Sequence, residues 1–328
     1  MAPQFAATTR ASELVPYYAS QIAGKTILIT GISSGSLGES FVKQVAVGKP
    51  AAFILAGRSP KKFQSLVDYI ASAHPSITVK TLALDLGSFV NVRKAAETVN
   101  SWSNSSIDIL VNNAGIMAVP YRLTEDGFES QLQTNHLGHF LFTNLIMGKI
   151  LASNAPRVVC ITSMGHRHGH IRWADPNFSD GKLYDRWAAY GQSKSANALM
   201  ALTLAERLGP KGLLSFSVCP GSVGTNLAAH EAHDLAAFVQ DFQAADARIG
   251  TKWMSGDGVL YKDLDQGIST HVFAAFDQDI AKVNGAYLNH CRVADPYAEE
   301  VWPWVTDKAS ADMLWKLSEK LVGQEFKY

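Results

Sequence analysis

Several features are scarce in this chain of 328 residues. It has three cysteines, which lie far apart and in or beside apolar runs: Cys160, Cys219 and Cys291. This pattern predicts buried, reduced thiols and excludes a disulfide framework. The formal net charge is zero, so the composition gives no indication of a nucleic-acid or acidic-lipid partner.

Long apolar segments are missing as well. No run approaches the roughly 18 residues of a membrane span. Residues 1–18 also lack the early positive charge and the apolar core of a signal peptide. We therefore expect a soluble, cytoplasmic protein with no transmembrane segment. Internal repeats and low-complexity tracts are not seen, so the sequence predicts a single main domain.

Short apolar runs alternate with longer segments of helical spacing, the clearest of which are 128–151 and 188–208. The runs are Thr26–Ile29, Ala52–Ala56, Val79–Leu84, Ile109–Val111, Val158–Ile161, Leu214–Val218 and Ala286–Leu288. Apolar strands separated by helices predict an α/β, doubly wound fold with a parallel sheet. Ligands of such folds bind at the carboxyl ends of the strands.

A glycine-rich turn follows the first apolar run. Between Gly31 and Gly38 it contains Ser33, Ser34, Gly35 and Leu37. Glycines let a backbone turn sharply and approach a pyrophosphate, and the next helix presents unpaired N–H groups to an anion. The position of this turn directly after an N-terminal strand predicts a dinucleotide site.

The end of the second run indicates which dinucleotide binds. An acidic residue near this point binds the ribose hydroxyls of NAD, whereas an arginine accommodates the 2′-phosphate of NADP. The chain has Arg58 here, with Ser59, Lys61 and Lys62 close by. An ordinary surface arginine is the alternative, but the planar guanidinium suits a phosphate and favours NADP (NADPH).

Two further strand ends carry residues suited to this cofactor. Asp85, followed by Leu86, can contact the adenine amine or can cap the helix expected to begin near Ser88. The segment after the fourth run supplies Asn112, Asn113, Ala114 and Gly115. Small residues let the backbone lie against a ribose, and the amides can tie adjacent strands together.

Tyr190 and Lys194 stand four residues apart in a segment of helical spacing, so their side chains share one face. A neighbouring positive charge favours the phenolate form of a tyrosine. Such a tyrosine can exchange a proton with an alcohol or a carbonyl group near neutral pH. The spacing alone also occurs on ordinary surface helices, so its weight comes from the other motifs.

Together these motifs resemble the short-chain dehydrogenase/reductase superfamily over residues 25–295. The matching pieces, in the family's order, are the Gly31–Gly38 turn, Asp85, Asn112–Gly115, Asn135, Ser163, Tyr190 with Lys194, and Pro220-Gly221. The sequence of residues 157–163, followed by His166, is most similar to the retinol-dehydrogenase-like branch of this superfamily. Filamentous-fungal members of the superfamily have a similar length. The resemblance implies a Rossmann fold and hydride transfer between a nicotinamide and a carbonyl or alcohol.

The resemblance also implies a role for each catalytic residue. Tyr190 would be the general acid or base, and Lys194 would lower its pKa and bind the nicotinamide ribose. Ser163 would polarise the substrate oxygen, and Asn135 would hold a water that relays protons to Lys194. Further cofactor contacts would come from Pro220, Gly221, Val223 and Thr225, although Thr225 can instead cap a helix.

One departure from the family concerns the glycine turn, which is one residue longer than Thr-Gly-x-x-x-Gly-x-Gly. Either Gly35 keeps its role and Ser36 is inserted after it, or Ser36 stands where a glycine is common.

The alternation of His166, His168 and His170 suggests a metal site. No carboxylate or cysteine cluster completes a metal site there, so we predict none.

We expect an N-terminal extension at 1–24, a Rossmann-type domain at 25–295 and a helical tail at 296–328. Residues 222–265 would form a lid that suits an apolar small-molecule substrate, with extra helices packed on the body as the alternative. The tail can close the pocket, pack on the core or contact a second subunit. A homodimer is possible, because the helices that bear Asn135 and Tyr190 commonly build dimers in this family.

The predicted function is NADP(H)-dependent hydride transfer between the nicotinamide and a carbonyl group, or a primary or secondary alcohol, of an apolar small molecule. Reduction, the reaction of a carbonyl reductase, is the favoured direction. An NAD-dependent alcohol dehydrogenase is one alternative. An epimerase or dehydratase of the same superfamily would need a larger C-terminal domain than the chain has after Tyr287. A non-catalytic dinucleotide-binding sensor would lack at least one of the four catalytic residues, and all four are present.

Overall fold

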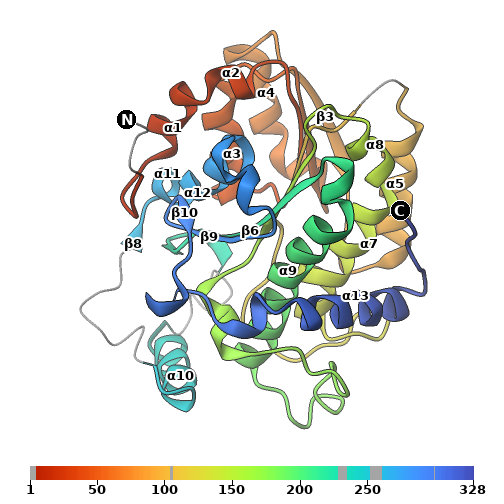
Figure 1. Cartoon of the computed structure of the whole chain (residues 1–328), viewed down its shortest axis with the longest axis vertical. Helices are drawn as coiled ribbons and strands as arrows, with labels where there is room; N and C mark the ends of the chain where they lie inside the picture. Colours follow the sequence, from red (N-terminus) through yellow and green to blue (C-terminus); the bar gives the residue numbers. More distant parts are fainter. Residues whose placement is uncertain (1–4, 104–105, 228–234, 252–260, 299) are drawn as a thin grey trace.

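A computed structural model of the chain describes residues 5–103, 106–227, 235–251, 261–298 and 300–328 (Figure 1). Its main sheet has eight strands in the order β10-β9-β6-β5-β4-β1-β2-β3, and only β10 runs antiparallel to its neighbour. The strands are β1 Thr26–Thr30, β2 Ala52–Gly57, β3 Thr78–Ala83, β4 Ile109–Asn112, β5 Arg157–Ile161, β6 Leu214–Cys219, β9 Tyr287–Asn289 and β10 Arg292–Val293. A separate parallel pair consists of β7 Ser222–Val223 and β8 Tyr261–Lys262.

Every predicted apolar run overlaps a strand of the main sheet, with bounds that differ by one residue at Leu84 and Ala286, so the doubly wound α/β prediction is confirmed. The strands that the sequence did not predict are β7, β8 and β10, each of two residues. Strands this short contain no apolar run to recognise. The hairpin from β9 to β10 turns at His290 and Cys291, whose φ angles are 54° and 56°.

Helices cover both faces of the sheet (Figure 1). The core on one face includes α5 Phe89–Ser101, α7 Gly138–Leu145 and α9 Arg186–Leu208, with α13 Lys308–Val322 packed against α9. The other face packs on α1 Ala11–Tyr17, α3 Leu37–Ala46, α4 Gln64–Ala73 and α12 Ser269–Phe276. Side chains of a strand alternate between faces, so Leu28 joins the first core while Ile27 and Ile29 join the second.

The segment 128–151 is helical as predicted but is not one regular helix. It consists of α6 Ser130–Leu132, a π-helical turn Gln133–Leu137, α7 and α8 Met147–Leu151. Glu129 begins it, because its carboxylate accepts hydrogen bonds from the backbone N–H groups of Gln131 and Leu132. π-helical turns inside helices are frequent at functional sites, and this one contains Asn135.

The first helices pack on the body of the domain. The hydroxyl of Tyr18, between α1 and α2 Ala19–Ile22, donates a hydrogen bond of 2.6 Å to Asp277, which follows α12. The backbone N–H of Ser12 donates to Asp265 of α11 Leu264–Gly267 at 2.9 Å. None of the helices described combines the length and the apolarity needed to cross a membrane. All three cysteines are buried and free, as predicted.

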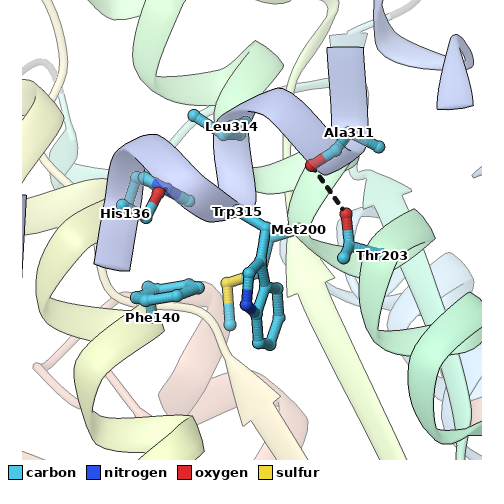
Figure 2. Close-up of a pocket in the computed structure, with 8 residues that line it drawn as sticks. His136, Phe140, Met200, Thr203, Ala311, Leu314 and Trp315 are labelled. Carbon is cyan, nitrogen blue, oxygen red and sulfur yellow. Dashed lines mark hydrogen bonds between the residues drawn. The ribbon is translucent and has the colours of Figure 1, made fainter. Parts of the chain in front are cut away.

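The last helix, α13, packs against α9 and runs across it (Figure 1). Figure 2 shows their contact, where Trp315 is enclosed and its ring centroid lies 4.9 Å from that of Phe140 on α7. The hydroxyl of Thr203 donates to the carbonyl oxygen of Ala311 at 2.9 Å. The tail was expected to close the pocket, to pack on the core or to contact a second subunit, and α13 packs on the core. A homodimer stays a prediction, and an interface built on α9 would have to include the outer side of α13.

Candidate active site

The glycine turn between β1 and α3 is tightly packed against the segment that follows β4. Gly31 has a φ of +79°, and a methyl group added to it would lie 2.5 Å from the Cα atom of Ala114. A methyl group on Gly38 would lie 2.8 Å from the carbonyl oxygen of Gly31. Gly35 has a φ of +71°. These glycines match the tight turn, the close helix packing and the open backbone of a dinucleotide-binding turn.

The extra residue of the turn has a structural role. Ser36 is the N-cap of α3, and its Oγ accepts hydrogen bonds from the N–H groups of Glu39 at 3.1 Å and Ser33 at 3.2 Å. Gly35 keeps the left-handed conformation, so the geometry favours the interpretation in which Ser36 is inserted after it. The amide of Asn226 donates to the carbonyl oxygen of Ser34 at 2.8 Å, which brings the segment after β7 against the turn.

Positive side chains follow β2. Arg58, Lys61 and Lys62 are exposed, and within the part of the chain that the structure describes none of them forms an ion pair. At the end of β3 the carboxylate of Asp85 accepts a hydrogen bond of 3.0 Å from the N–H of Gly87. The N-cap of α5 is Ser88, so the alternative in which Asp85 caps this helix is wrong.

The segment after β4 is tied to its neighbours by asparagine amides, as predicted. The amide of Asn113 donates to the carbonyl oxygen of Thr30 in β1 at 2.8 Å, and the amide of Asn112 donates to the hydroxyl of Thr143 in α7 at 2.9 Å. The hydroxyl of Thr30 accepts from the N–H of Ala114 at 2.9 Å. It also lies 2.8 Å from Nε2 of His139, a buried histidine of α7.

Asn135 and Lys194 meet beside Gly115. A methyl group on Gly115 would lie 3.2 Å from Oδ1 of Asn135 and 3.3 Å from Nζ of Lys194. The side chain of Asn135 is occupied, because Oδ1 accepts from the N–H of Ile116 at 2.8 Å and Nδ2 donates to the hydroxyl of Ser193 at 2.8 Å. The ammonium of Lys194 donates to the carbonyl oxygen of Ile161 at 3.1 Å, at the end of β5.

Ser163 and Tyr190 face each other across Gly165. A methyl group on Gly165 would lie 2.6 Å from Cε1 of Tyr190 and 3.4 Å from Oγ of Ser163. The hydroxyl of Ser163 accepts a hydrogen bond of 3.0 Å from the N–H of Gly165. The ammonium of Lys194 lies 5.7 Å from the centre of the Tyr190 ring. The four residues predicted as catalytic therefore converge beyond the carboxyl ends of β4 and β5.

Burial governs the protonation of this cluster. It raises the pKa of Tyr190 to about 12, although the hydrogen bond with Ser163 lowers it. Burial also lowers the pKa of Lys194 to about 8, against the effects of the thiols of Cys219 and Cys160. The lysine effect expected from the sequence does not dominate the pKa of Tyr190, because the phenol is almost fully buried. The phenol is therefore protonated at neutral pH.

Sequence reasoning missed several residues that hold the cluster. The hydroxyl of Thr162 donates to the carbonyl oxygen of Lys194 at 2.7 Å, and the amide of Asn197 donates to the carbonyl oxygen of Ile161 at 3.0 Å. These side chains bind backbone atoms, which leave no signal in a single sequence. A short 3₁₀ helix, η3 Met164–His168, carries Gly165 and packs on α9.

Aromatic side chains of α10 Leu235–Arg248 cover Tyr190. The ring of Phe242 lies 4.5 Å from that of Trp187 on α9, and Trp187 lies 6.4 Å from Tyr190. Phe238, Met117 and Ala118 complete this apolar cluster. Of the lid expected at 222–265, residues 228–234 and 252–260 lie outside the described residues.

Two charged contacts join α10 to the start of α9. The guanidinium of Arg186 lies 2.5 Å from the carboxylate of Asp241, and that of Arg248 lies 2.6 Å from the carboxylate of Asp185. A buried pair lies nearby, with Nε2 of His168 3.5 Å from the carboxylate of Asp246. α10 is thus joined to the body by both aromatic and polar contacts.

The segment after β6 passes close to the same site. Gly221, which follows Pro220, has a φ of +87°, and a methyl group on it would lie 3.2 Å from the side chain of Lys262. Val223 lies in β7. The hydroxyl of Thr225 accepts a hydrogen bond of 3.2 Å from the N–H of Leu227. This bond has the pattern of a helix cap, the alternative role that the sequence suggested for Thr225.

Known proteins resemble this chain over almost its whole length. A family model described as short chain dehydrogenase matches residues 25–175. Retinol dehydrogenase 13 of Homo sapiens is 32% identical over 304 residues, which cover 93% of this chain and 86% of that protein. The short-chain dehydrogenase/reductase prx1 of Penicillium roqueforti is 34% identical over 311 residues, which cover 91% and 85%. The chain belongs to the short-chain dehydrogenase/reductase family and is retinol-dehydrogenase-like.

Solved structures agree with this assignment. An uncharacterised protein of Mycobacterium paratuberculosis has a TM-score of 0.69 and 30% identity, covering 94% of this chain and 98% of its own. A gluconate 5-dehydrogenase of Burkholderia cenocepacia, solved with NADP and tartrate, has a TM-score of 0.59 and 22% identity, covering 81% and 93%. At that identity the likeness concerns the fold alone. As a family member, the chain is an oxidoreductase that uses a nicotinamide dinucleotide for hydride transfer.

Proposed function

We propose that this protein is an NADPH-dependent carbonyl reductase that acts on apolar small molecules in the cytoplasm. The observation that carries the proposal is the convergence of Ser163 and Tyr190 across Gly165, with Lys194 beside them. An acid, a hydroxyl that can orient a carbonyl oxygen, and a cation stand within one buried cluster. This combination suits proton transfer coupled to hydride transfer.

The cofactor site proposed here fits the residues present. The glycine turn has no room for side chains at Gly31 and Gly38, and Gly35 presents bare backbone. Arg58 is exposed and without an ion pair among the described residues, so its guanidinium is available for a 2′-phosphate. When bound, NADPH would supply the hydride. Further contacts are proposed for Ser33, Ser34, Leu37, Asp85, Leu86, Asn112, Ala114, Gly115, Pro220, Gly221, Val223 and Thr225.

The protein's own part in the reaction follows from protonation states. A Tyr190 with a pKa of about 12 holds its proton at neutral pH and can donate it to a carbonyl oxygen. Ser163 would hold that oxygen in place. Lys194, with a pKa of about 8, is mainly charged at neutral pH and would stabilise the phenolate that remains. A protonated acid at rest favours reduction over oxidation.

An apolar substrate is proposed because of what surrounds Tyr190. Trp187, Phe238 and Phe242 form an aromatic cluster over it, and Met117 and Ala118 lie at its edge. A polar substrate would lose its hydration against these side chains, which offer it little hydrogen bonding besides the indole N–H of Trp187. We therefore expect ketones or aldehydes with an apolar or aromatic body to react.

The first test compares binding of NADPH and NADH, measured by calorimetry, in wild type and in Arg58→Ala. We expect NADPH to bind more tightly, and we expect the variant to lose about 10- to 100-fold of its NADPH affinity with little change for NADH. Lys94→Ala removes an exposed positive charge on α5 and serves as the matched control.

The second test is Tyr190→Phe with a panel of apolar ketones and NADPH. It should abolish reduction while NADPH still binds, because it removes only the proton donor.

Two outcomes would contradict the proposal. Equal affinity for NADH in wild type would contradict the NADPH proposal and favour an NAD-dependent alcohol dehydrogenase. Binding of NADPH with no turnover of any carbonyl compound would favour a non-catalytic dinucleotide-binding sensor.

A further inference from the structure

A carboxylate occupies the glycine turn. Oε2 of Glu39 accepts a hydrogen bond of 2.6 Å from the backbone N–H of Gly35. Glu39 belongs to the first turn of α3, where the positive end of the helix stabilises an anion. Its side chain is only 13% exposed, so the contact is part of the packed turn.

The backbone at Gly35 is also where a pyrophosphate would approach this turn. In dinucleotide-binding turns the first glycine makes the tight turn, the third packs against the strand, and the second lets the pyrophosphate approach the backbone. Gly31 and Gly38 fill the first and third roles by their contacts. Gly35 remains for the second role, and among the described residues a methyl group there would meet only Asn226, at 3.2 Å.

We infer that Glu39 competes with the pyrophosphate of the cofactor for Gly35 and thereby limits dinucleotide affinity. The inference rests on the cofactor site proposed above. Two anions cannot accept the same hydrogen bond, and each raises the free energy of the other by charge repulsion. The carboxylate of Glu39 must therefore leave Gly35 before a pyrophosphate binds there.

Lys43 gives the displaced carboxylate a partner. Its ammonium lies 2.8 Å from Oε1 of Glu39, the oxygen that does not bind Gly35, and the two residues are one helical turn apart. This ion pair can persist while Oε2 moves away. Lys43 therefore reduces the penalty that Glu39 imposes on dinucleotide binding. Lys43 would not affect dinucleotide affinity in this way if the side chain at position 39 carried no charge.

The decisive variant is Glu39→Gln, tested by calorimetry with three probes. Glutamine keeps the shape and a carbonyl oxygen that can accept from Gly35, but it carries no charge. We expect the Kd values of NADPH and ADP-ribose to fall about tenfold, equivalent to about 1.4 kcal/mol. The Kd of 2′-AMP should stay unchanged, because this ligand has the 2′-phosphate but no pyrophosphate.

Two further variants sharpen the test. Glu97→Gln makes the same charge change on the exposed side of α5 and should leave all three Kd values unchanged. Lys43→Gln should raise the Kd of ADP-ribose in wild type but not in the Glu39→Gln background, a coupling that a double-mutant cycle measures. If Glu39→Gln proves unstable, Lys43→Gln alone still tests the inference, because it should raise the Kd of ADP-ribose and leave that of 2′-AMP unchanged.

The outcomes separate this inference from the proposed function. Unchanged or weaker ADP-ribose binding in Glu39→Gln, with normal binding by wild type, would overturn the inference and make Glu39 a structural cap. An equal fall in the Kd of 2′-AMP would overturn the inference too, because the loss of a negative charge would then improve the binding of any anion and not of a pyrophosphate in particular. Failure of every dinucleotide to bind wild type and variants alike would overturn the proposed cofactor site itself.

Discussion

The backbone N–H of Trp302 donates a hydrogen bond of 3.1 Å to Nε2 of His166. The other ring nitrogen, Nδ1, lies 2.8 Å from the carbonyl oxygen of Ser163, so it donates and the imidazole is neutral. The indole N–H of Trp304 donates to the hydroxyl of Ser195 on α9 at 3.2 Å. One buried histidine thus joins the C-terminal tail to the candidate catalytic serine.

We predict that His166→Leu lowers kcat by about 10²-fold, because the carbonyl group of Ser163 loses one of the hydrogen bonds that position it. NADPH affinity should stay unchanged, since the glycine turn is untouched. Steady-state kinetics with NADPH titration measure both effects. His166→Gln, which keeps a donor and an acceptor, should recover part of kcat. An equal loss of NADPH affinity in His166→Leu would instead indicate general unfolding of the site.

Gly165 should be essential for catalysis although it carries no functional group. Gly165→Ala places a methyl group 2.6 Å from the Tyr190 ring, so the phenol or Ser163 must move. We expect kcat to fall by about 10²-fold with NADPH affinity retained.

The control for this prediction is Gly148→Ala on α8. A methyl group there meets no atom of the described residues within 4 Å, and alanine favours a helix by about 1 kcal/mol over glycine. Its activity should equal that of wild type. Full activity of Gly165→Ala would show that Ser163 and Tyr190 need not stand as the structure has them.

Stability should fall in mild acid because buried histidines are kept neutral. Burial lowers the pKa of these side chains from 6.5 to about 3 or about 4: His136, His139, His166, His168 and His271. The unfolded chain binds more protons below pH 6.5, so stability is complete above that pH and is lost as the pH falls toward 4. Each group loses about 1.4 kcal/mol by pH 5.5.

The measurement is urea unfolding at several pH values between 5 and 7.5. Five such groups together approach the whole stability of a typical domain, about 5–15 kcal/mol, so we expect unfolding near pH 5. His271→Phe removes one titrating group and should reduce the slope of unfolding free energy against pH by about one proton. A stability that does not change down to pH 5 would contradict the depressed pKa values.

Much of the fold follows from local sequence patterns. Strands β1, β2 and β4 are recognisable because consecutive apolar residues point to two buried faces. The glycine turn is recognisable because its conformations exclude other residues, as at Gly31 and Gly35. The family resemblance then predicted that Asn135, Ser163 and Tyr190 share one site, and the parallel pairing of β4 with β5 brings the segments after these strands together.

The finer architecture of the site was not predictable, because it depends on contacts between distant segments. Nothing local to Trp187 indicates that Phe238 and Phe242 cover it. Asn135 lies in a π-helical turn and its side chain bonds to Ile116 and Ser193, neither of which a periodicity can show. The spacing of apolar residues predicted a helical segment over 128–151, but it did not predict that this segment is divided into several helices.

The sequence by itself determined the family, the doubly wound sheet and the identity of the candidate catalytic residues, because these depend on motif order and hydrophobic periodicity. Only the tertiary structure decided how deeply those residues are buried and how this changes their pKa values. It buries Tyr190, so its pKa rises where the neighbouring Lys194 suggested a fall. It also joins the tail to His166. Burial and long-range hydrogen bonds are properties of the packed chain, and they set the chemistry of the site.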